Sequence, residues 1–472
     1  MRQWIWVLTI AAATQAASAS QLRSDSEIQR ILAERLKGFD QRVGIVVGVI
    51  GSEGRRIVAH GSMGGGNSRP VNGDTLYEIG SITKVFTSLI LADMVERGEV
   101  ALTDPVTRYL PAGVKVPERN GQQITLNDLA THRSALPRMP SNFAPKDPLN
   151  PYIDYPVDRL YEFLASHELR RDIGAEYEYS NLGAGLLLHA LARRAGKEYE
   201  GLLRERVFRP LGMKSTGITR VPSLKSRLAT PHSSALNLAP TPLWDFTEAL
   251  AGAGAIRSSA NDLLTFLEAN LGYKKTPLSA AMARMLAIRR SGRDNSEIGL
   301  GWNIESSYGL EIVWHGGATY GSRCFTGYDP KSLVGVVVFS NYNSGSGIDD
   351  IGRYLLNRKA AVDERAVVKP RERIVSSVPP RLLDAYAGRY RFSNDDIWTV
   401  RRDGSRFLMK KPSGAEFEIF PEGNFETSND DFFSKSADAL FTFDFDKESP
   451  GRATQLTVSW GFLQPRRGNR ID

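Results

Sequence analysis

The chain has 472 residues, of which 41% are hydrophobic and 24% are charged, a composition that is typical of a globular protein and excludes a disordered or fibrous chain. It contains one cysteine, Cys324, so no intrachain disulfide can form. The formal net charge is +7, but the basic residues are scattered along the chain and form no aromatic-interleaved stripe. Nucleic acid is therefore not an expected partner.

The N-terminus has the features of an export signal. Arg2 precedes the apolar residues 4–13, and Ala17-Ser18-Ala19 fits the A-x-A pattern of a cleavage site. We predict a signal peptide over residues 1–19 and a mature chain that is secreted or periplasmic. The apolar run is too short to cross a bilayer, and no later segment has the ~20 apolar residues of a membrane helix, so stable membrane insertion is not expected.

Helices and strands are predicted in a consistent order over the first 360 residues. A capping box formed by Ser24 and Glu27 opens a helix that ends near Gly38. The region from Ser81 to Arg290 is mainly helical in its apolar spacing. Five short segments are predicted strands: Val43–Ile50, Arg56–His60, Leu310–Trp314, Arg323–Tyr328 and Val334–Ser340. This order predicts one antiparallel sheet that is built from both ends of the region and flanked by helices. A helical lobe joins this sheet, and we expect a ligand site at the boundary between the two.

The sequence changes character after residue 360. Residues 361–379 are charged and contain prolines, which indicates a linker. Residues 380–472 then contain short alternating segments, which predict a small antiparallel β-barrel or sandwich. The clearest of these segments are Trp398–Arg401, Arg406–Lys410, Phe417–Phe420 and Leu440–Phe445. The predicted organisation is an α+β domain over residues 20–360, a linker, and a small β domain.

Ser81 and Lys84 form the first candidate catalytic motif. They are the ends of the only S-x-x-K sequence, preceded by Gly80 and followed by an apolar helical pattern that ends at Gly98. Residues i and i+3 share a helix face, so Lys84 projects beside the Ser81 hydroxyl, near the partial positive charge of a helix N-terminus. Burial lowers the pKa of a lysine and allows it to accept a proton near neutral pH. The alternative interpretation is that Ser81 only caps the helix and Lys84 reaches solvent.

Two further motifs carry groups that suit acyl transfer. Tyr179-Ser180-Asn181 is the only Y-x-N sequence and precedes a helical run. A tyrosine hydroxyl can pass a proton to a leaving group, and an asparagine amide can bind a substrate carbonyl or the lysine. His315-Gly316-Gly317 follows the strand ending at Trp314, and its glycines allow close approach of a substrate backbone. The N–H group of Ala318 could then join that of Ser81 in an oxyanion hole, although a Gly-Gly pair after a strand is more often only a turn.

In this order, the three motifs resemble the serine penicillin-binding superfamily, specifically its class C β-lactamase branch, which also contains D,D-carboxypeptidases, D-aminopeptidases and carboxylesterases. The resemblance covers about residues 25–360. It includes the connecting segments Glu78–Ser81, Ile124–His132 and Arg209–Met213. It implies a class C β-lactamase-like fold, which the barrel-like domain follows.

The resemblance also implies roles for individual residues. Ser81 is the acylated nucleophile, Lys84 and Tyr179 form the proton-transfer network, and Asn181 contacts the lysine or the substrate. Which of Lys84 and Tyr179 takes the serine proton stays open. His132, in one of the shared segments, is expected to be structural.

One motif departs from the family pattern. β-Lactamases and carboxypeptidases of this branch carry Lys-Thr-Gly where this chain has His315-Gly316-Gly317. A neutral histidine binds a substrate carboxylate less well than lysine does, and this form looks more like the D-aminopeptidase and esterase members. The segments Leu110–Gly113 and Ser134–Pro137, by contrast, are similar to those of penicillin-binding D,D-carboxypeptidase/endopeptidase members.

The sequence therefore predicts an exported serine hydrolase that acts on small peptides next to D-residues, with possible binding or hydrolysis of β-lactams. The alternatives are a carboxylesterase of the same branch and a penicillin-binding protein with little turnover. No cofactor or metal is expected, because the sequence has no metal-ligand spacing and no nucleotide-binding glycine loop. A G-x-S-x-G elbow is also absent, which excludes an α/β-hydrolase. The sequence does not predict an oligomeric state.

Overall fold

The computed structural model describes residues 22–39, 42–219, 225–233, 240–307, 309–343, 347–357, 359–363, 375–393, 396–412, 416–422, 431–434, 440–445, 451–459 and 466–472. The predicted signal peptide, residues 1–19, lies outside these ranges, and so do residues 364–374 of the predicted linker. Within the described ranges, no helix is both long and apolar enough to cross a bilayer.

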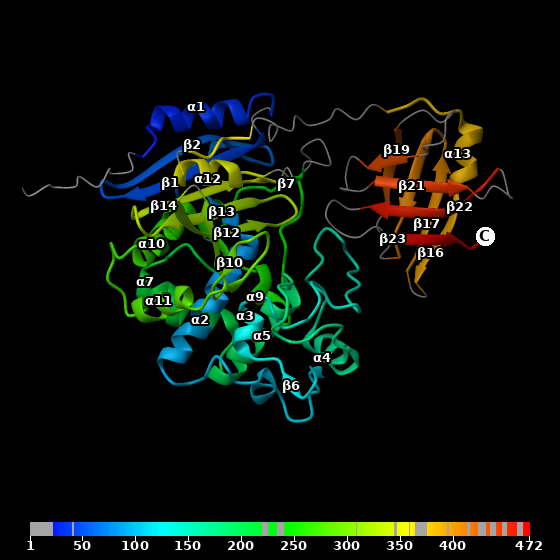
Figure 1. The fold of residues 1–472 in the computed structure, drawn as a ribbon. Helices are drawn as coiled ribbons and strands as arrows, with labels where there is room; N and C mark the ends of the chain where they lie inside the picture. The colour runs from blue at the N-terminus through cyan, green and yellow to red at the C-terminus, as the bar shows by residue number, and fades with distance from the viewer. Residues whose placement is uncertain are drawn as a thin grey trace, which may run out of the picture.

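A nine-stranded antiparallel sheet joins the two ends of the larger, N-terminal part of the chain (Figure 1). Its order is β3-β2-β1-β14-β13-β12-β11-β10-β9, and the central pair β1 and β14 runs in register from Ile45 opposite Ser340 to Ile50 opposite Gly335. The strands are β1 (Gly44–Gly51), β2 (Gly54–Gly64), β3 (Asn67–Pro70), β9 (Arg290–Ser291), β10 (Glu297–Ile298), β11 (Asn303–Ser307), β12 (Leu310–Ala318), β13 (Arg323–Asp329) and β14 (Val334–Ser340). The predicted pairing of N-terminal with C-terminal strands is confirmed.

Both faces of this sheet are covered by helices, which is why β1 is apolar at consecutive positions. Ile45, Val47 and Val49 pack in one core with α1 (Asp25–Arg35) and α12 (Asp349–Leu356). Val46 and Ile50 pack in the other core, on the opposite face. Helix α1 begins where predicted, because the Ser24 side chain accepts a hydrogen bond from the Glu27 N–H.

A helical lobe lies against the second face and surrounds α2, every residue of which from Thr83 to Met94 is buried. Such an all-round buried helix belongs in the interior of a large domain. The helices of this part are α2 (Thr83–Glu96), α3 (Leu126–Ala130), α4 (Val157–Ser166), α5 (Asn181–Ala195), α6 (Tyr199–Leu203), α7 (Arg209–Leu211), α9 (Ala251–Gly254), α10 (Ala260–Asn270) and α11 (Ser279–Ala287). Short strand pairs connect its loops: β4 (Leu76–Glu78) with β8 (Arg257–Ser259), β5 (Glu118–Arg119) with β6 (Gln122–Gln123), and β7 (His232–Ser233) with β15 (Tyr342–Asn343).

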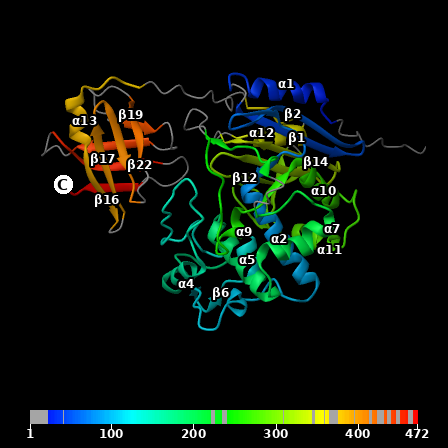
Figure 2. The same cartoon turned by 180° about the vertical axis from the view of Figure 1, so that it is seen from behind.

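The C-terminal part is a closed antiparallel barrel (Figure 2). Its eight strands, in sequence order around the barrel, are β16 (Gly388–Ser393), β17 (Asp396–Asp403), β18 (Arg406–Lys410), β19 (Glu416–Glu422), β20 (Asp431–Ser434), β21 (Leu440–Phe445), β22 (Ala453–Ser459) and β23 (Arg466–Arg470). Helix α13 (Pro380–Tyr386) contributes Leu383 and Tyr386 to the barrel's aromatic core. Closure pairs β16 with β23 and leaves no free sheet edge in the described barrel.

The predicted architecture, an α+β domain with a helix-flanked antiparallel sheet followed by a small β-barrel, is confirmed. The strand that leads to the predicted site differs from the prediction. Strand β12 does not end at Trp314 but continues through His315, Gly316 and Gly317 to Ala318. Glycine is usually depleted in strands, so the sequence pattern alone ended this one too early.

Candidate active site

Ser81 lies in a single 3₁₀ turn, Gly80–Ile82, which leads directly into α2. Gly80 has φ +48°, in the region that favours glycine. A Cβ atom built on Gly80 would lie 2.6 Å from the Ala318 carbonyl oxygen and 2.7 Å from the Ala318 nitrogen. Gly80 therefore lets the end of β12 lie directly beside the serine.

The second close contact is at Gly317. A Cβ atom there would overlap the Ile79 carbonyl oxygen, a backbone atom that cannot move aside as a side chain could. The two glycines thus hold the Ala318 backbone next to Ser81. This contact explains why the glycines lie within the strand rather than in a turn after it.

The Lys84 amine is buried directly behind Ser81. Its Nζ lies 3.0 Å from Ser81 Oγ, 2.9 Å from Asn181 Oδ1 and 2.7 Å from the Ala253 carbonyl oxygen, all within hydrogen-bond distance. The residue is only 2% exposed. Burial, and to a lesser extent the charge of Arg138, lowers the pKa of Lys84 well below its usual 10.5.

These three partners are compatible with a neutral amine. A neutral amine has two N–H bonds and one lone pair, and a carbonyl oxygen can only accept. The N–H bonds therefore go to Asn181 Oδ1 and the Ala253 carbonyl oxygen, and the lone pair faces the Ser81 hydroxyl. This arrangement suits removal of the serine proton.

Tyr179 lies on the other side of the serine hydroxyl and is hydrogen-bonded to it. Lys84 Nζ lies 4.8 Å and Arg138 Cζ 5.1 Å from the centre of the Tyr179 ring. Burial nevertheless raises the pKa of Tyr179 above its usual 10.0, since hydrogen bonding to Ser81 and the Arg138 charge only partly oppose it. Tyr179 is therefore a neutral phenol at physiological pH and can donate a proton.

His132 holds the segment that carries Tyr179. Its Nδ1 accepts the Ser180 N–H at 3.2 Å, and its ring centre is 4.6 Å from that of Tyr179. Ser180 also caps α5, because its Oγ accepts the Gly183 N–H at 2.8 Å. Burial lowers the pKa of His132, which keeps the imidazole neutral. Its role in this structure is to position Tyr179.

Asn181, at the start of α5, orients the lysine. While Oδ1 accepts from Lys84, Nδ2 donates to the Tyr152 hydroxyl at 3.2 Å, which fixes the amide. The Tyr152 ring stacks on Phe246 with ring centres 4.5 Å apart and lies 5.1 Å from Trp244. These three aromatic residues form one wall of the cleft.

His315 lies across the cleft from Tyr179, with ring centres 6.5 Å apart. Its Nδ1 is 2.7 Å from the Gly316 carbonyl oxygen, which can only accept, so Nδ1 carries the hydrogen. Burial lowers the pKa of His315 to about 3, with a smaller effect from Lys84. The imidazole is therefore neutral and offers no positive charge to a substrate.

A buried carboxylate ties the cleft walls together. Glu78, at the end of β4, accepts hydrogen bonds from the Trp244 N–H at 2.6 Å and the Thr319 hydroxyl at 2.7 Å. Burial raises the pKa of Glu78, and the nearby Arg257 partly opposes this. The segment before the serine, the aromatic wall and the end of β12 are thereby held in one arrangement.

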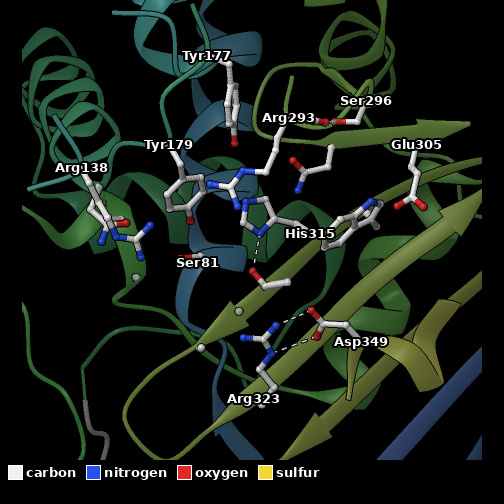
Figure 3. A pocket seen from close by; sticks show the side chains of 18 of the residues that line it. Ser81, Arg138, Tyr177, Tyr179, Arg293, Ser296, Glu305, His315, Arg323 and Asp349 are labelled. Atoms are coloured by element: carbon white, nitrogen blue, oxygen red, sulfur yellow. Dashed lines mark hydrogen bonds and ion pairs between the residues drawn. The ribbon is translucent and has the colours of Figure 1, made fainter. Parts of the chain in front are cut away.

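The cleft has a volume of about 750 Å³ (Figure 3). Among the residues predicted from sequence, those that line it are Ser81, Tyr179, Asn181, His315, Gly316, Gly317 and Ala318, while Lys84 lies behind Ser81. The lining residues that sequence reasoning missed include Arg138, Tyr152, Trp244, Phe246, Arg293, Arg323 and Asp349. They come from loops, from strand β13 and from the first residue of helix α12, none of which carries a recognisable motif. The only signal was that Arg138 directly follows the shared segment Ser134–Pro137. Within the described ranges, no three His, Cys, Asp or Glu side chains converge as a metal site requires.

Comparisons with known proteins agree with this geometry. The family model described as Beta-lactamase matches residues 28–360, and a domain of unknown function, DUF3471, matches residues 372–468. The chain is 32% identical over 271 residues to the D-alanyl-D-alanine-carboxypeptidase/endopeptidase AmpH of Escherichia coli (strain K12). The matched region covers 55% of this chain and 68% of that protein.

Two solved structures extend the comparison. The β-lactamase/D-alanine carboxypeptidase from Yersinia pestis, complexed with citrate, is 30% identical with a TM-score of 0.58, over 67% of this chain and 92% of that chain. The octameric penicillin-binding protein homologue from Pyrococcus abyssi has a TM-score of 0.64 over 95% of this chain and 100% of that chain. At 21% identity, this second similarity concerns the fold alone.

The close approach at Gly317 gives a testable prediction. Gly317→Ala should displace β12 from the serine turn and slow acylation by a chromogenic β-lactam or ester by ~10²-fold, because a shift of about 1 Å at a reacting centre has effects of that size. Gly316→Ala is the matched control, since its Cβ would lie 3.2 Å from a side-chain atom of Asp349. It should slow acylation much less. Equal acylation rates for the two variants, with both folded by circular dichroism, would contradict this account.

Proposed function

The chain belongs to the β-lactamase family of serine hydrolases, and we propose that it cleaves amide bonds next to D-residues of cell-wall peptides through an acyl-enzyme on Ser81. The observation that carries this proposal is the 3.0 Å contact between Lys84 Nζ and Ser81 Oγ at the floor of the cleft. The 32% identity to a D-alanyl-D-alanine-carboxypeptidase/endopeptidase supports the substrate class. The signal-peptide pattern of residues 1–19 supports an exported enzyme.

In the acylation step, neutral Lys84 removes the Ser81 proton and Oγ attacks the substrate carbonyl carbon. The backbone N–H groups of Ser81 and Ala318 stabilise the resulting oxyanion, a role that the close approach of β12 at Gly80 supports. The C–N bond then breaks, and Tyr179 donates its proton to the leaving nitrogen. Tyr179 recovers a proton from the ammonium of Lys84, so the acyl-enzyme forms with both groups reset.

In the deacylation step, the same groups act on water. Lys84 takes a proton from a water molecule, which attacks the ester carbonyl of the acyl-enzyme. The Ser81–acyl bond breaks, and Ser81 Oγ regains a proton through the same network. Lys84 is the better base of the two candidates, because burial favours the neutral form of the amine and disfavours the phenolate of Tyr179.

A carboxylesterase is the second candidate function, and neutral His315 is the observation that favours it. With its pKa lowered to about 3, His315 supplies no cation for a substrate carboxylate at the edge of β12. Four substrates separate the candidates: a D-alanyl-D-alanine peptide, a D-aminoacyl amide, nitrocefin and a short p-nitrophenyl ester. The proposal expects the highest kcat/KM for a peptide, whereas rapid turnover of the ester alone would support the esterase.

The nucleophile assignment gives a direct prediction. Ser81→Ala should abolish labelling by a fluorescent penicillin or a fluorophosphonate, because the atom that forms the acyl bond is removed. Ser88→Ala, on the same helix but buried away from the cleft, is the control and should label as the wild-type protein does. Persistent labelling of folded Ser81→Ala would refute the assignment.

The base assignment gives a pH prediction. Since Lys84 must be neutral to accept the proton and its pKa is lowered, the acylation rate should rise with pH through that lowered pKa and fall as Lys84 becomes protonated below it. Lys84→Arg cannot lose its charge and should lower the rate by ~10²–10⁴ at every pH. The measurement is the acylation rate against pH, with a substrate that does not titrate near neutrality. A variant that keeps the wild-type pH profile would exclude Lys84 as the base.

A further inference from the structure

The charges of the cleft are distributed unevenly. On the β12 side, Arg323 is paired with Asp349 at 2.5 and 3.1 Å (Figure 3). Arg353 is paired with Glu305 at 3.3 Å. His315 on the same side is neutral. The guanidinium groups of Arg138 and Arg293 also line the cleft, and neither has an acidic partner within ion-pair distance among the residues that the structure describes. An unpaired cation in a cleft is available to an anionic ligand.

Arg138 is the better placed of these two arginines. Arg293 lies in the loop between β9 and β10, directly before the acidic residue Asp294, which lines the same cleft. Arg138 lies between Pro137 and Met139, and its guanidinium faces the Tyr179 ring at 5.1 Å. Its charge is close enough to the catalytic groups to lower the pKa of Lys84 and to oppose the rise in the pKa of Tyr179.

The backbone of Arg138 is held firmly while its side chain is exposed. Its carbonyl oxygen accepts the N–H groups of Asn181 at 3.0 Å and Leu182 at 3.2 Å, at the start of α5. The side chain is exposed and makes no hydrogen bond within the described part of the chain. Because the backbone is fixed and the guanidinium has no hydrogen-bond partner, Arg138 is suited to binding a ligand. The protein then loses only side-chain freedom when the ligand binds.

We propose that Arg138 binds the carboxylate of the leaving group, so that the enzyme releases a C-terminal amino acid with a free carboxyl group. This inference rests on the proposed function. Tyr179 protonates the leaving nitrogen, so the leaving group lies beside the Tyr179 hydroxyl, and the Arg138 guanidinium lies 5.1 Å from the centre of the same ring (Figure 3). The carboxylate carbon of a departing amino acid is two bonds from that nitrogen, which brings it within reach of the guanidinium.

The chemistry of the two groups fits. A guanidinium donates two parallel hydrogen bonds to a carboxylate, a stronger and more directional contact than a lysine makes. During the reaction the carboxylate is unchanged: the C–N bond breaks, Ser81 Oγ bonds to the acyl carbon, and the amine leaves with the Tyr179 proton. His315 provides no cation on the β12 side, and Arg138 supplies one from the opposite wall.

A pair of peptides tests this proposal: the same D-alanyl-D-alanine peptide with a free C-terminal carboxylate and with a C-terminal amide. Wild-type enzyme should prefer the free acid. Arg138→Ala should lower kcat/KM for the acid by about 10–100-fold, mainly through KM, as expected for loss of a charge-assisted hydrogen-bonded pair. It should change kcat/KM for the amide less, because only the effect of its charge on Lys84 and Tyr179 is lost there. Arg138→Lys should fall between the two, because it keeps the charge and loses the two-pronged geometry.

The control is Arg293→Ala, which should leave the acid-to-amide ratio as it is in the wild-type enzyme. Labelling by an uncharged fluorophosphonate shows that each variant has a folded active site. An equal loss with both peptides in Arg138→Ala would overturn the proposal and indicate that Arg138 acts only on Tyr179. No change with either peptide would also overturn it. If the wild-type enzyme cleaves neither peptide but hydrolyses esters, the proposed function itself fails and this inference fails with it.

Discussion

The burial of the Lys84 amine is the constraint on which the rest of the structure depends. A lysine that is only 2% exposed at the centre of a helical core is costly unless its amine N–H groups have acceptors. Asn181 and the Ala253 carbonyl oxygen supply two such acceptors from two different helices, α5 and α9. The third partner is the serine hydroxyl. The same contacts that stabilise the lysine in the core thus place its amine beside the Ser81 hydroxyl, as the proposed acylation step requires.

The second requirement is that a strand from the far end of the domain reaches the serine. Glycines at positions 80 and 317 allow this, because any larger residue would push the backbone of β12 away from the turn at Ser81. Glu78 then fixes the end of β12 and the aromatic wall to the strand that precedes the turn. Residues separated by more than 200 positions in sequence therefore meet with backbone precision, which is what an oxyanion hole needs.

Sequence reasoning predicted the local parts of this site well and the long-range parts poorly. Ser81 and Lys84 are one helical turn apart, so their proximity follows from helix geometry, and the alternative in which Lys84 reaches solvent is wrong. Arg138 and Tyr152 lie in a long loop without periodicity, so no pattern could place them in the cleft. In the C-terminal part, alternation predicted β17, β18, β19 and β21. It missed β16, β20, β22 and β23, and it could not distinguish a barrel from a sandwich, because closure depends on the pairing of β16 with β23.

The two walls of the cleft divide its chemistry. Glycines and a neutral histidine on the β12 side suit an uncharged backbone, whereas the opposite side carries Tyr179 and an unpaired guanidinium. The proposed acylation step depends on the protonation state of the Lys84 amine. The most direct test is an NMR titration of the Lys84 Nζ resonance, assigned by its loss in Lys84→Arg. Our account predicts a midpoint well below those of the surface lysines and below the usual 10.5. A midpoint equal to that of the surface lysines would show a charged amine at neutral pH and would contradict it.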